Sequence, residues 1–349
     1  MLQYSDKQIY ILVDDNTKQY CLPIFLEMLQ EKYGWNINAS HIFTISPGEE
    51  HKTIGTVCAL WHALVEQNVT RNALLFNLGG GVITDLGGFV ASTYRRGIDY
   101  INVPTTLLSM VDAGFGGKTG FDFDGLKNAI GTFKKPVDTW IEPCFLKSLP
   151  REELLSGYAE MVKHALLADH RVLEETLRNI GVFLEIDRAS QEDLLLCEQM
   201  LCDSINIKQN IVALDPAETG VRKSLNLGHT IGHALEELSF VKGSPLRHGF
   251  AVMQGLVAEL FISCKIKGLH RDVLTQMSRL MVNYYIKPHF EVSDFDQLFG
   301  YMQSDKKNRT TSEINFTLLT TIGDYKVDNV VNRELIEESL IYLRGINYE

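Results

Sequence analysis

The first 150 residues alternate between short apolar stretches and amphipathic segments, and this alternation limits the folds that are open to the chain. Strands are expected at residues 8–13, 41–46, 73–78 and 100–103, and helices at 21–32, 53–68 and 85–94. Strand–helix alternation is typical of a mainly parallel sheet that is covered by helices. The sequence therefore predicts an α/β fold for this part of the chain.

The chain changes character after Pro150. Between residues 152 and about 287, nearly every segment has the apolar spacing of a helix, and β-branched runs are few. Residues 314–320 are an exception and predict a single late strand. We expect an α/β domain at residues 1–150 and a mostly α-helical domain at 151–349. A binding cleft is expected between the two domains, where such sites often form.

Composition and charge exclude several classes of protein. The 349 residues carry a net charge of −11, which argues against nucleic acid as a general partner. The apolar run at 249–264 is interrupted by Gln254 and Glu259, so we expect no membrane span, and the N-terminus lacks a signal-peptide pattern. The six cysteines lack zinc-ribbon and Cys-x-x-Cys spacing. Buried thiols in a cytoplasmic protein are therefore expected.

A glycine-rich turn follows the strand expected at 73–78. It reads Gly-Gly-Gly-Val-Ile-Thr-Asp at 79–85 and precedes the helix expected at 85–94. Glycines at such a turn allow the backbone to approach a pyrophosphate, which the free N–H groups of a helix N-terminus would bind. The Gly-x-Gly-x-x-Thr pattern differs from the usual dinucleotide fingerprint, so an ordinary tight turn remains an alternative.

A second group of polar residues lies in the glycine-rich segment that ends at Gly-Gly-Lys-Thr. The glycine that a Walker A loop would need is replaced by Asp112, which argues against a nucleoside triphosphatase. Lys118, Lys127 and Asn128 are expected close together in loops, where two cations and an amide could bind an anion.

A polar stripe at 222–233 carries further candidate residues. Arg222, Asn226, His229 and His233 follow one another at steps of four, three and four, so on one helix they would share a face. A solvated helix face would show the same spacing. The aliphatic residues around the stripe favour a lined cleft that holds an anion, a metal ion and a transferable proton.

Several residues could bind that metal ion. Glu160 and Lys163 are expected on one face of a helix, and with His229, His233 and His248 they supply enough donors for three ligands and an open position. Periodicity alone does not choose among these donors, or between them and His164. The residue after His229 is not glutamate, so the general base of a His-Glu-x-x-His protease is missing.

Taken in order, these segments resemble the 3-dehydroquinate synthases of the sugar-phosphate cyclase family. The resemblance covers nearly the whole chain. It rests on GGGVITDLGG at 79–88, RRGIDYINVPTTLL at 95–108, VDAGFGGKTG at 111–120, GLKNAIGTF at 125–133, SGYAEMVKHAL at 156–166, DPAETGVRKSLNLGHTIGHALE at 215–236, RHG at 247–249 and DKK at 305–307.

The resemblance implies an NAD-binding α/β domain and a helical metal-binding domain. It implies a cytoplasmic lyase that uses NAD and one divalent metal, zinc or cobalt. The substrate would be 3-deoxy-D-arabino-heptulosonate 7-phosphate, and the products 3-dehydroquinate and phosphate, in the second step of the shikimate pathway. A homodimer without nucleic-acid or membrane partners is expected.

The resemblance also implies roles for individual residues. Glu160, His229 and His248 would be the metal ligands. His233, Glu218, Lys163 and Arg96 would be catalytic. Substrate contacts would come from Asp112, Lys118, Asn128, Lys208, Arg222, Asn226 and one or both of Lys306 and Lys307. NAD contacts would come from Asp15 or Asn16, Glu49, Lys52, Gly80, Gly81, Asp85, Thr105, Thr106 and Lys127.

The sequence departs from the family pattern at two places. Phe250 stands where the family commonly has a glutamate after His-Gly, which removes a carboxylate close to the expected metal site. Ala-Gly-Phe follows Asp112 where two serines are common. One rival reading is a sister cyclase that acts on another sugar phosphate and would share the metal and NAD sites. A second is a polyol dehydrogenase with a similar two-domain plan, which would use NAD and a metal but need no phosphate pocket. A non-catalytic metabolite-binding protein is a third, but it predicts losses among the metal or acid–base positions, and we find none.

Overall fold

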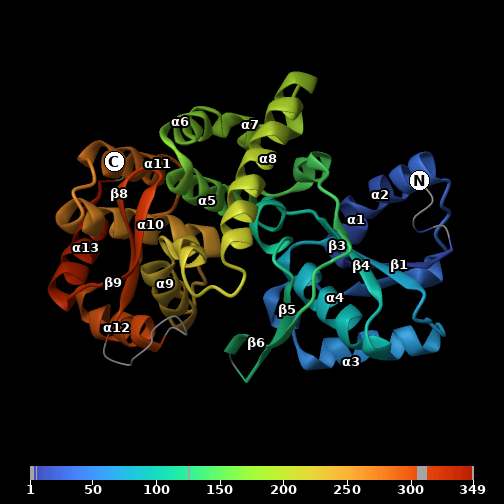
Figure 1. Ribbon diagram of the computed structural model, residues 1–349. Coiled ribbons are helices and arrows are strands. Elements are labelled where there is room, and N and C mark those ends of the chain that lie inside the picture. The colour runs from blue at the N-terminus through green and yellow to red at the C-terminus, as the bar shows by residue number, and fades with distance from the viewer. Residues whose placement is uncertain (1–3, 5, 125, 305–312, 348–349) are drawn as a thin grey trace. The chain divides into compact units, whose positions relative to one another are not determined.

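The computed structural model of the protein describes residues 4, 6–124, 126–304 and 313–347 (Figure 1). The chain forms two compact units. Unit 1 contains Met1–Pro150 and Glu185–Glu198, and unit 2 contains Arg151–Leu184 and Gln199–Glu349. The predicted metal and proton-transfer residues other than Arg96 belong to unit 2, and the described residues predicted to contact NAD belong to unit 1.

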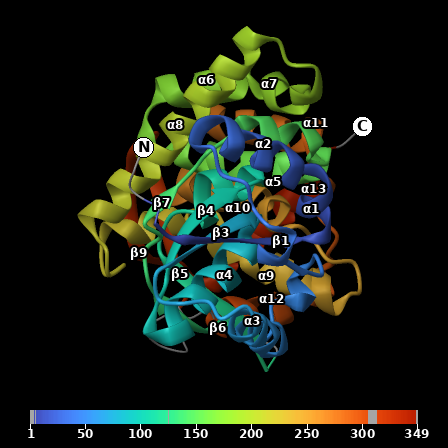
Figure 2. The same cartoon turned by 90° about the vertical axis from the view of Figure 1, so that its right-hand side faces the viewer.

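Unit 1 is built on a five-stranded sheet in which all neighbouring strands run parallel, as predicted (Figure 2). The strand order is β2-β1-β3-β4-β7. Strands β1 and β3 therefore lie side by side, and the chain continues from β1 to β2 on one side of this pair and from β3 to β4 on the other. Their apolar residues are buried on both faces, as is typical of a parallel sheet covered by helices. The strands are β1 (Gln8–Asp14), β2 (Ile42–Ile45), β3 (Ala73–Gly79), β4 (Asp99–Pro104) and β7 (Asp138–Thr139).

The helices of unit 1 begin close to the carboxyl ends of the strands. They are α1 (Asp15–Tyr20), α2 (Leu22–Tyr33), α3 (Ile54–Glu66) and α4 (Gly81–Thr93). Helix α4 begins four residues before the predicted start at 85, because the glycine turn itself forms its first turn. It packs very closely on β3. A Cβ atom at Gly87 would lie 2.1 Å from the side-chain oxygen of Asn77.

The segment after Asp112 forms a β-hairpin where we expected loops. Strands β5 (Lys118–Phe123) and β6 (Leu126–Phe133) pair in antiparallel fashion. Lys118 pairs with Phe133, and Asn128 lies five residue steps from Phe133 along β6, about 17 Å along a strand. The expectation that Lys118, Lys127 and Asn128 lie together in a loop is therefore wrong.

Unit 2 is mostly helical, as predicted, and Figure 1 shows its helices around α10. The helices are α5 (Arg151–Ala168), α6 (His170–Arg178), α7 (Ile180–Leu184), α8 (Gln191–Leu214, which starts in unit 1), α9 (His229–Val241), α10 (His248–Ile266), α11 (Arg271–Tyr284), α12 (Phe295–Ser304) and α13 (Arg333–Gly345).

Short 3₁₀-helices occur in both units. They lie at Ala39–His41, Glu49–His51, Tyr94–Arg96, Pro143–Ser148, Ile186–Arg188, Val221–Asn226 and Val292–Asp294.

Helix α10 forms the centre of unit 2. By length and composition it could cross a bilayer, which the sequence did not lead us to expect, but 78% of its apolar window is buried within the protein. It contacts α5, α9, α11, α13 and β8. This burial is that of the core helix of a globular domain.

The late strand expected at 314–320 is one half of a hairpin. Strand β8 (Asn315–Thr321) pairs in antiparallel fashion with β9 (Asp324–Val330). The expectation of a single strand is therefore wrong. The polar sequence of β9 hid its partner: Asp324 begins the strand, and alternate residues along it are exposed.

Candidate metal centre and nucleotide site

Three side chains from separate helices of unit 2 meet at one point. Glu160 comes from the middle of α5, His229 is the first residue of α9, and His248 is the first residue of α10. Oε1 of Glu160 lies 3.4 Å from Nε2 of His229 and 3.3 Å from Nε2 of His248. One ligand atom from each residue lies within 4.8 Å of the other two. The structure thus brings the three predicted metal ligands together.

This geometry fits a zinc-type ion. Tetrahedral ligands about 2.0–2.2 Å from zinc lie roughly 3.3–3.6 Å from one another, and the two observed separations lie within this range. Glu160 is fully buried, and its carboxylate faces the Lys163 ammonium and the two imidazoles. A buried carboxylate needs partners that offset its charge, and a metal ion among these three ligand atoms would add to the charge that Lys163 supplies.

Lys163 and the histidines set the charge of Glu160. Burial alone would raise the pKa of this carboxyl group, but the Lys163 ammonium and the His229 ring outweigh burial and hold the pKa well below its usual range. Lys163 lies one turn along α5 and forms an ion pair with Oε2. Glu160 is therefore anionic at neutral pH.

Contacts on the far side of each imidazole fix its orientation. Nδ1 of His229 lies 3.1 Å from the carbonyl oxygen of Leu227, and Nδ1 of His248 lies 3.1 Å from Oε2 of Glu236. Burial lowers the pKa of His248, but hydrogen bonds to Glu160 and Glu236 outweigh burial and raise it to about 10. In both rings Nε2 faces Glu160, as metal-binding histidines require.

His233 completes a group of three imidazoles. Its ring centroid lies 5.2 Å from that of His229 and 5.8 Å from that of His248. His233 follows His229 by one helical turn on α9, so the predicted shared face holds for these two residues. His164, which the sequence left open as a ligand, lies on α5 with Nδ1 2.8 Å from the hydroxyl of Ser204.

The polar stripe at 222–233 does not form one helix, so the prediction of a single face is wrong. Arg222 and Asn226 lie on the 3₁₀-helix Val221–Asn226, and α9 begins only at His229. Gly228 separates the two with a φ of 79°, a left-handed conformation that glycine adopts readily. Glu259 stabilises this break, because its carboxylate accepts hydrogen bonds from the N–H groups of Gly228 (2.6 Å), Thr230 and Ile231.

The loop before Arg222 is built around Asp215. The Asp215 carboxylate accepts backbone hydrogen bonds from Thr219, Gly220 and Arg222 at 2.7–3.1 Å. Burial alone would raise the pKa of Asp215, but these donors outweigh burial and lower it. Glu218 is held in this loop with a φ of 58°.

Two predicted anion-binding residues, Arg222 and Asn226, lie beside Glu218 of this loop. Arg222 is buried, donates from Nη1 to the carbonyl of Pro216, and has Nε 4.0 Å from Glu218. Asn226 donates to Glu218 at 3.4 Å. Lys208, from α8, is also buried. Lys306 and Lys307 lie outside the described residues.

In unit 1, the residues predicted to bind NAD lie at the carboxyl ends of neighbouring parallel strands. Asp15 and Asn16 follow β1, Gly80 and Gly81 follow β3, and Thr105 and Thr106 follow β4. Ligands of open α/β sheets bind at this edge, where neighbouring strands lead the chain in opposite directions. In this sheet that point lies between β1 and β3.

The glycine turn leaves little room for side chains. A Cβ atom at Gly80 would lie 3.0 Å from Cγ2 of Thr106. Gly81 begins α4, whose free N–H groups can bind a pyrophosphate. These residues fit a dinucleotide, because the glycines have no side chains to block its approach to the N-terminus of α4.

A buried ion pair lies beside the glycine turn. Nζ of Lys52 lies 2.7 Å from Asp85 and 3.7 Å from Glu49. Burial lowers the pKa of Lys52, but these two carboxylates outweigh burial and raise it. Three predicted cofactor residues are therefore in contact with one another.

The remaining predicted residues of unit 1 come from three other segments. Asp112 is half-buried in a π-helical turn at Ser109–Ala113, and Arg96 is exposed with a φ of 68°. Lys118, Lys127 and Asn128 are exposed on the β5–β6 hairpin.

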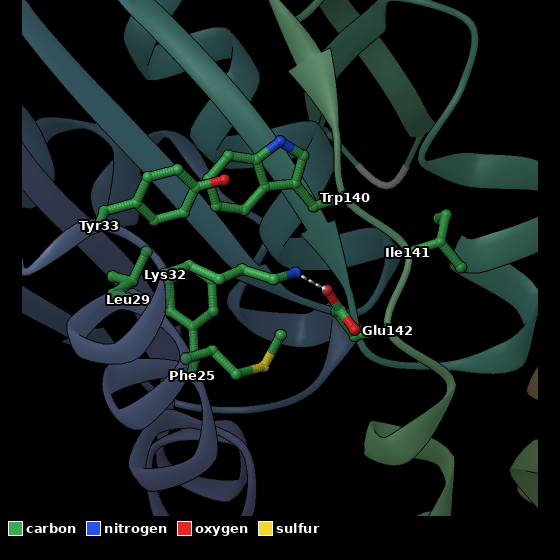
Figure 3. Close-up of a pocket in the computed structure, with 8 residues that line it drawn as sticks. Phe25, Leu29, Lys32, Tyr33, Trp140, Ile141 and Glu142 are labelled. Atoms are coloured by element: carbon green, nitrogen blue, oxygen red, sulfur yellow. Dashed lines mark ion pairs between the residues drawn. The ribbon is translucent and has the colours of Figure 1, made fainter. Parts of the chain in front are cut away.

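A cavity of about 240 Å³ in unit 1 belongs to none of these sites. It is lined by residues of α2 and of the segment after β7, including the stacked rings of Tyr33 and Trp140 (Figure 3). Lys32 and Glu142 lie 3.6 Å apart at its edge. None of its lining residues is a predicted site residue.

Sequence reasoning missed three residues that support the site, Glu236, Glu259 and Asp215. A signal existed for Glu236, because Gly228, Gly232 and Glu236 recur at four-residue steps. Glu259 was noted only as an interruption of an apolar run. Its role depends on a contact 31 residues away in the chain, which no local pattern shows.

The chain is similar to known proteins over nearly its full length. The family descriptions "3-dehydroquinate synthase N-terminal" and "3-dehydroquinate synthase C-terminal" match residues 42–156 and 157–308. A 3-dehydroquinate synthase of Parabacteroides distasonis is 41% identical over 337 residues, which cover 97% of this chain and 91% of that protein. One from Pyrococcus abyssi is 37% identical over 332 residues, with coverages of 95% and 92%.

Solved structures show the same fold. A 2-epi-5-epi-valiolone synthase from Streptomyces hygroscopicus with NAD⁺ and Zn²⁺ bound superposes with a TM-score of 0.82 at 26% identity, covering 98% of this chain and 91% of that one. A 2-deoxy-scyllo-inosose synthase in complex with NAD⁺ and Co²⁺ has a TM-score of 0.80 at 23% identity, with coverages of 99% and 92%. The family matches and the full-length relatives together show that this chain belongs to the 3-dehydroquinate synthase family.

Proposed function

We propose that the chain converts 3-deoxy-D-arabino-heptulosonate 7-phosphate to 3-dehydroquinate and phosphate, as the resemblance to 3-dehydroquinate synthases implies. The enzyme is an NAD- and metal-dependent carbon–oxygen lyase of the shikimate pathway, and zinc or cobalt is the metal. The observation that carries the proposal is the convergence of Glu160, His229 and His248 in a member of this family.

The three ligands leave part of the coordination sphere open to substrate oxygens. When bound, the metal supplies a Lewis acid for substrate hydroxyls, and NAD supplies a hydride acceptor that returns its hydride, so no net redox change results. Glu160 contributes negative charge to this centre, and we assign Lys163, its ion-pair partner, to a substrate hydroxyl.

Proton transfer falls to residues close to the metal ligands. We assign His233 to the transfer of a proton at the reacting carbons, because its ring lies within 6 Å of both ligand imidazoles. We assign Glu218 as a proton acceptor, and its contact with Asn226 orients its carboxylate. Lys163 and Arg96 are assigned to catalysis on the family resemblance.

The phosphate and carboxylate of the substrate need separate cations. We assign Arg222 and Asn226 to the phosphate, together with Lys118, Asn128 and the pair Lys306 and Lys307. A planar guanidinium can hold a leaving phosphate dianion through two parallel hydrogen bonds. We assign Asp112 and Lys208 to the hydroxyls and carboxylate.

The NAD site is proposed at the carboxyl edge of the sheet in unit 1. Gly80 and Gly81 would face the pyrophosphate. The residues assigned to the rest of the cofactor are Asp15, Asn16, Glu49, Lys52, Asp85, Thr105, Thr106 and Lys127. We propose that residues 1–150 act as the NAD-binding domain and residues 151–349 as the metal- and substrate-binding domain.

The surroundings of the enzyme are also proposed. We propose a homodimer in the cytoplasm with no nucleic-acid or membrane partner. Exposed apolar residues on the β5–β6 hairpin, among them Phe133 at 86% exposure, support association with a second chain. Burial raises the pKa of Cys21 to about 11 and of Cys197 to about 12, which suits inert thiols, whereas Cys202 is exposed.

Phosphate release tests the proposed reaction. The metal-loaded enzyme with NAD should release one phosphate for each 3-dehydroquinate formed from the heptulosonate phosphate, and NADH should not accumulate. Omission of NAD, or removal of the metal by a chelator, should stop both. Stoichiometric NADH without phosphate release would support a dehydrogenase instead. Faster turnover of glucose 6-phosphate, which has a phosphate but no carboxylate, would support a sister cyclase.

A further inference from the structure

Helices α9 and α10 pack in an antiparallel pair with a regular register. A Cβ atom at Gly228 would lie 2.7 Å from Leu256, and one at Gly232 would lie 2.9 Å from the carbonyl oxygen of Ala251. One turn further along α9, Glu236 contacts His248 at the start of α10. The glycines bring the helix axes together, and this close approach places Glu236 beside a predicted metal ligand.

His248 lies between two carboxylates. Its Nε2 atom lies 3.3 Å from Glu160, and its Nδ1 atom lies 3.1 Å from Glu236. The side chains of His248 and Glu236 are 28% and 15% exposed, so solvent competes only partly for this contact. An ionised carboxylate only accepts hydrogen bonds. Nδ1 of His248 therefore donates to Glu236, so Nε2, which faces Glu160, is the nitrogen that would exchange its proton for a metal ion.

Phe250 does not take part in this arrangement. Its side chain is buried and packs edge-on against Tyr285 at 5.0 Å, and the Tyr285 hydroxyl donates to the carbonyl of Leu155. Phe250 is thus a core residue that holds α10 against α5. Glu236 from α9, by contrast, places a carboxylate directly against His248.

We propose that Glu236 is a positioning residue for the metal centre, which fixes the tautomer and ring orientation of His248 through Nδ1. This inference rests on the proposed ligation by Glu160, His229 and His248. A carboxylate on the far nitrogen also raises the basicity of the ligating one, and loss of such a partner typically costs about 10- to 100-fold in metal affinity. Glu236 acts through His248 and touches neither substrate nor cofactor in this account.

Zinc affinity, measured by competition with a chromophoric chelator, tests the proposal. Glu236→Gln keeps the shape and one acceptor oxygen but loses the charge, so zinc affinity should fall about tenfold, and Glu236→Ala should cost about a hundredfold. Glu237→Gln is the matched control, because Glu237 is the next residue of α9 and its side chain is exposed. Its zinc affinity should stay within twofold of that of the wild type.

Two further measurements separate positioning from general stability. The thermal midpoint of the metal-free Glu236→Gln protein should match that of Glu237→Gln within about 2 °C. The visible bands of the cobalt-substituted protein should change in position or intensity, because the His248 ring is free to turn. Unchanged zinc affinity in both Glu236 variants would overturn the proposal, as would a loss of affinity that is matched by a loss of metal-free stability.

The ligand assignment can fail separately from the proposal for Glu236. His248→Ala, measured in the same way, should lose far more affinity than either Glu236 variant. If His248→Ala bound zinc like the wild type, the proposed ligation would be wrong, and the role of Glu236 would fall with it. If His248→Ala lost zinc while the Glu236 variants kept full affinity, only the role of Glu236 would be wrong.

Discussion

The carboxylate of Glu259 accepts a hydrogen bond of 2.6 Å from the backbone N–H of Gly228, one residue before the predicted metal ligand His229. Its other oxygen accepts from Thr230 and Ile231. Gly228 has no side chain to cap α9, so a residue of α10 serves as the cap and fixes the position at which the helix begins.

Replacement of this buried cap should destabilise unit 2. In Glu259→Gln the amide turns one N–H₂ group toward backbone donors, and each donor left unsatisfied costs roughly 1–3 kcal/mol. We expect a loss of about 2–4 kcal/mol in the free energy of unfolding, measured with urea. Glu237→Gln, an exposed change in α9, should cost less than about 0.5 kcal/mol. Equal stability of the two variants would contradict the capping role.

Gly80→Val should weaken NAD binding. A Cβ atom at Gly80 would already lie 3.0 Å from Thr106, so a branched side chain must occupy the space in front of α4. We expect at least a tenfold rise in the Kd for NAD, about 1.4 kcal/mol, by calorimetric titration. Gly181→Val is the control, because a Cβ atom there meets no atom within 4 Å. Unchanged NAD affinity in Gly80→Val would place the pyrophosphate elsewhere.

Arg222→Lys should weaken substrate binding and leave the metal in place. The change keeps the charge but loses the planar fork, which should cost roughly 1.5–3 kcal/mol, or about ten- to a hundredfold in substrate affinity. Arg222 and His229 belong to different helical segments, so metal content should stay near that of the wild type. If the variant lost its metal but bound the substrate normally, Arg222 would support the metal ligands and the phosphate assignment would be wrong.

Asp215 should contribute stability that disappears in acid. Its pKa in the folded protein is lowered from the usual 3.8 by backbone donors. A group with a lowered folded pKa stabilises the protein above its unfolded pKa, and that stability is lost as the pH falls through the folded value. Asp215→Asn should therefore be less stable than the wild type at pH 7, and the difference should shrink below about pH 4.

Urea unfolding of both proteins from pH 7 to pH 3 measures this difference. Asp272→Asn is the control, since the Asp272 side chain is 80% exposed. A gap between Asp215→Asn and the wild type that stayed constant or widened in acid would show that the carboxylate charge does not hold the loop.

Local patterns predicted the parts of the fold whose signals are local. Strands β1 and β3 are apolar runs, each of which is followed in the sequence by an amphipathic segment. The observed bounds of each strand differ from its predicted bounds by a single residue. The β5–β6 hairpin was missed because β6 is exposed along nearly its whole length, so no inside–outside alternation marks it. Strand β9 was missed because charged residues such as Asp324 and Lys326 occupy it.

In the site, too, local patterns predicted only part of what the structure shows. Glu160, His229 and His248 could be chosen only through the family resemblance, because spacing left several histidines open. The break at Gly228 could not be predicted, since the helical period continues across it and a distant carboxylate, Glu259, decides where α9 begins. Glu236 likewise acts through a contact between two helices, which a single-helix pattern does not contain.

The metal content of His229→Ala tests the central claim most directly. The His229→Ala protein, purified and then dialysed against a buffer that contains zinc, should hold well under about 0.2 zinc ions per chain by elemental analysis. The two remaining ligands bind zinc only weakly. His270→Ala, a change at an exposed histidine, should hold one zinc per chain like the wild type. A folded His229→Ala protein that kept one zinc ion per chain would contradict the account, because the ion would then be held elsewhere.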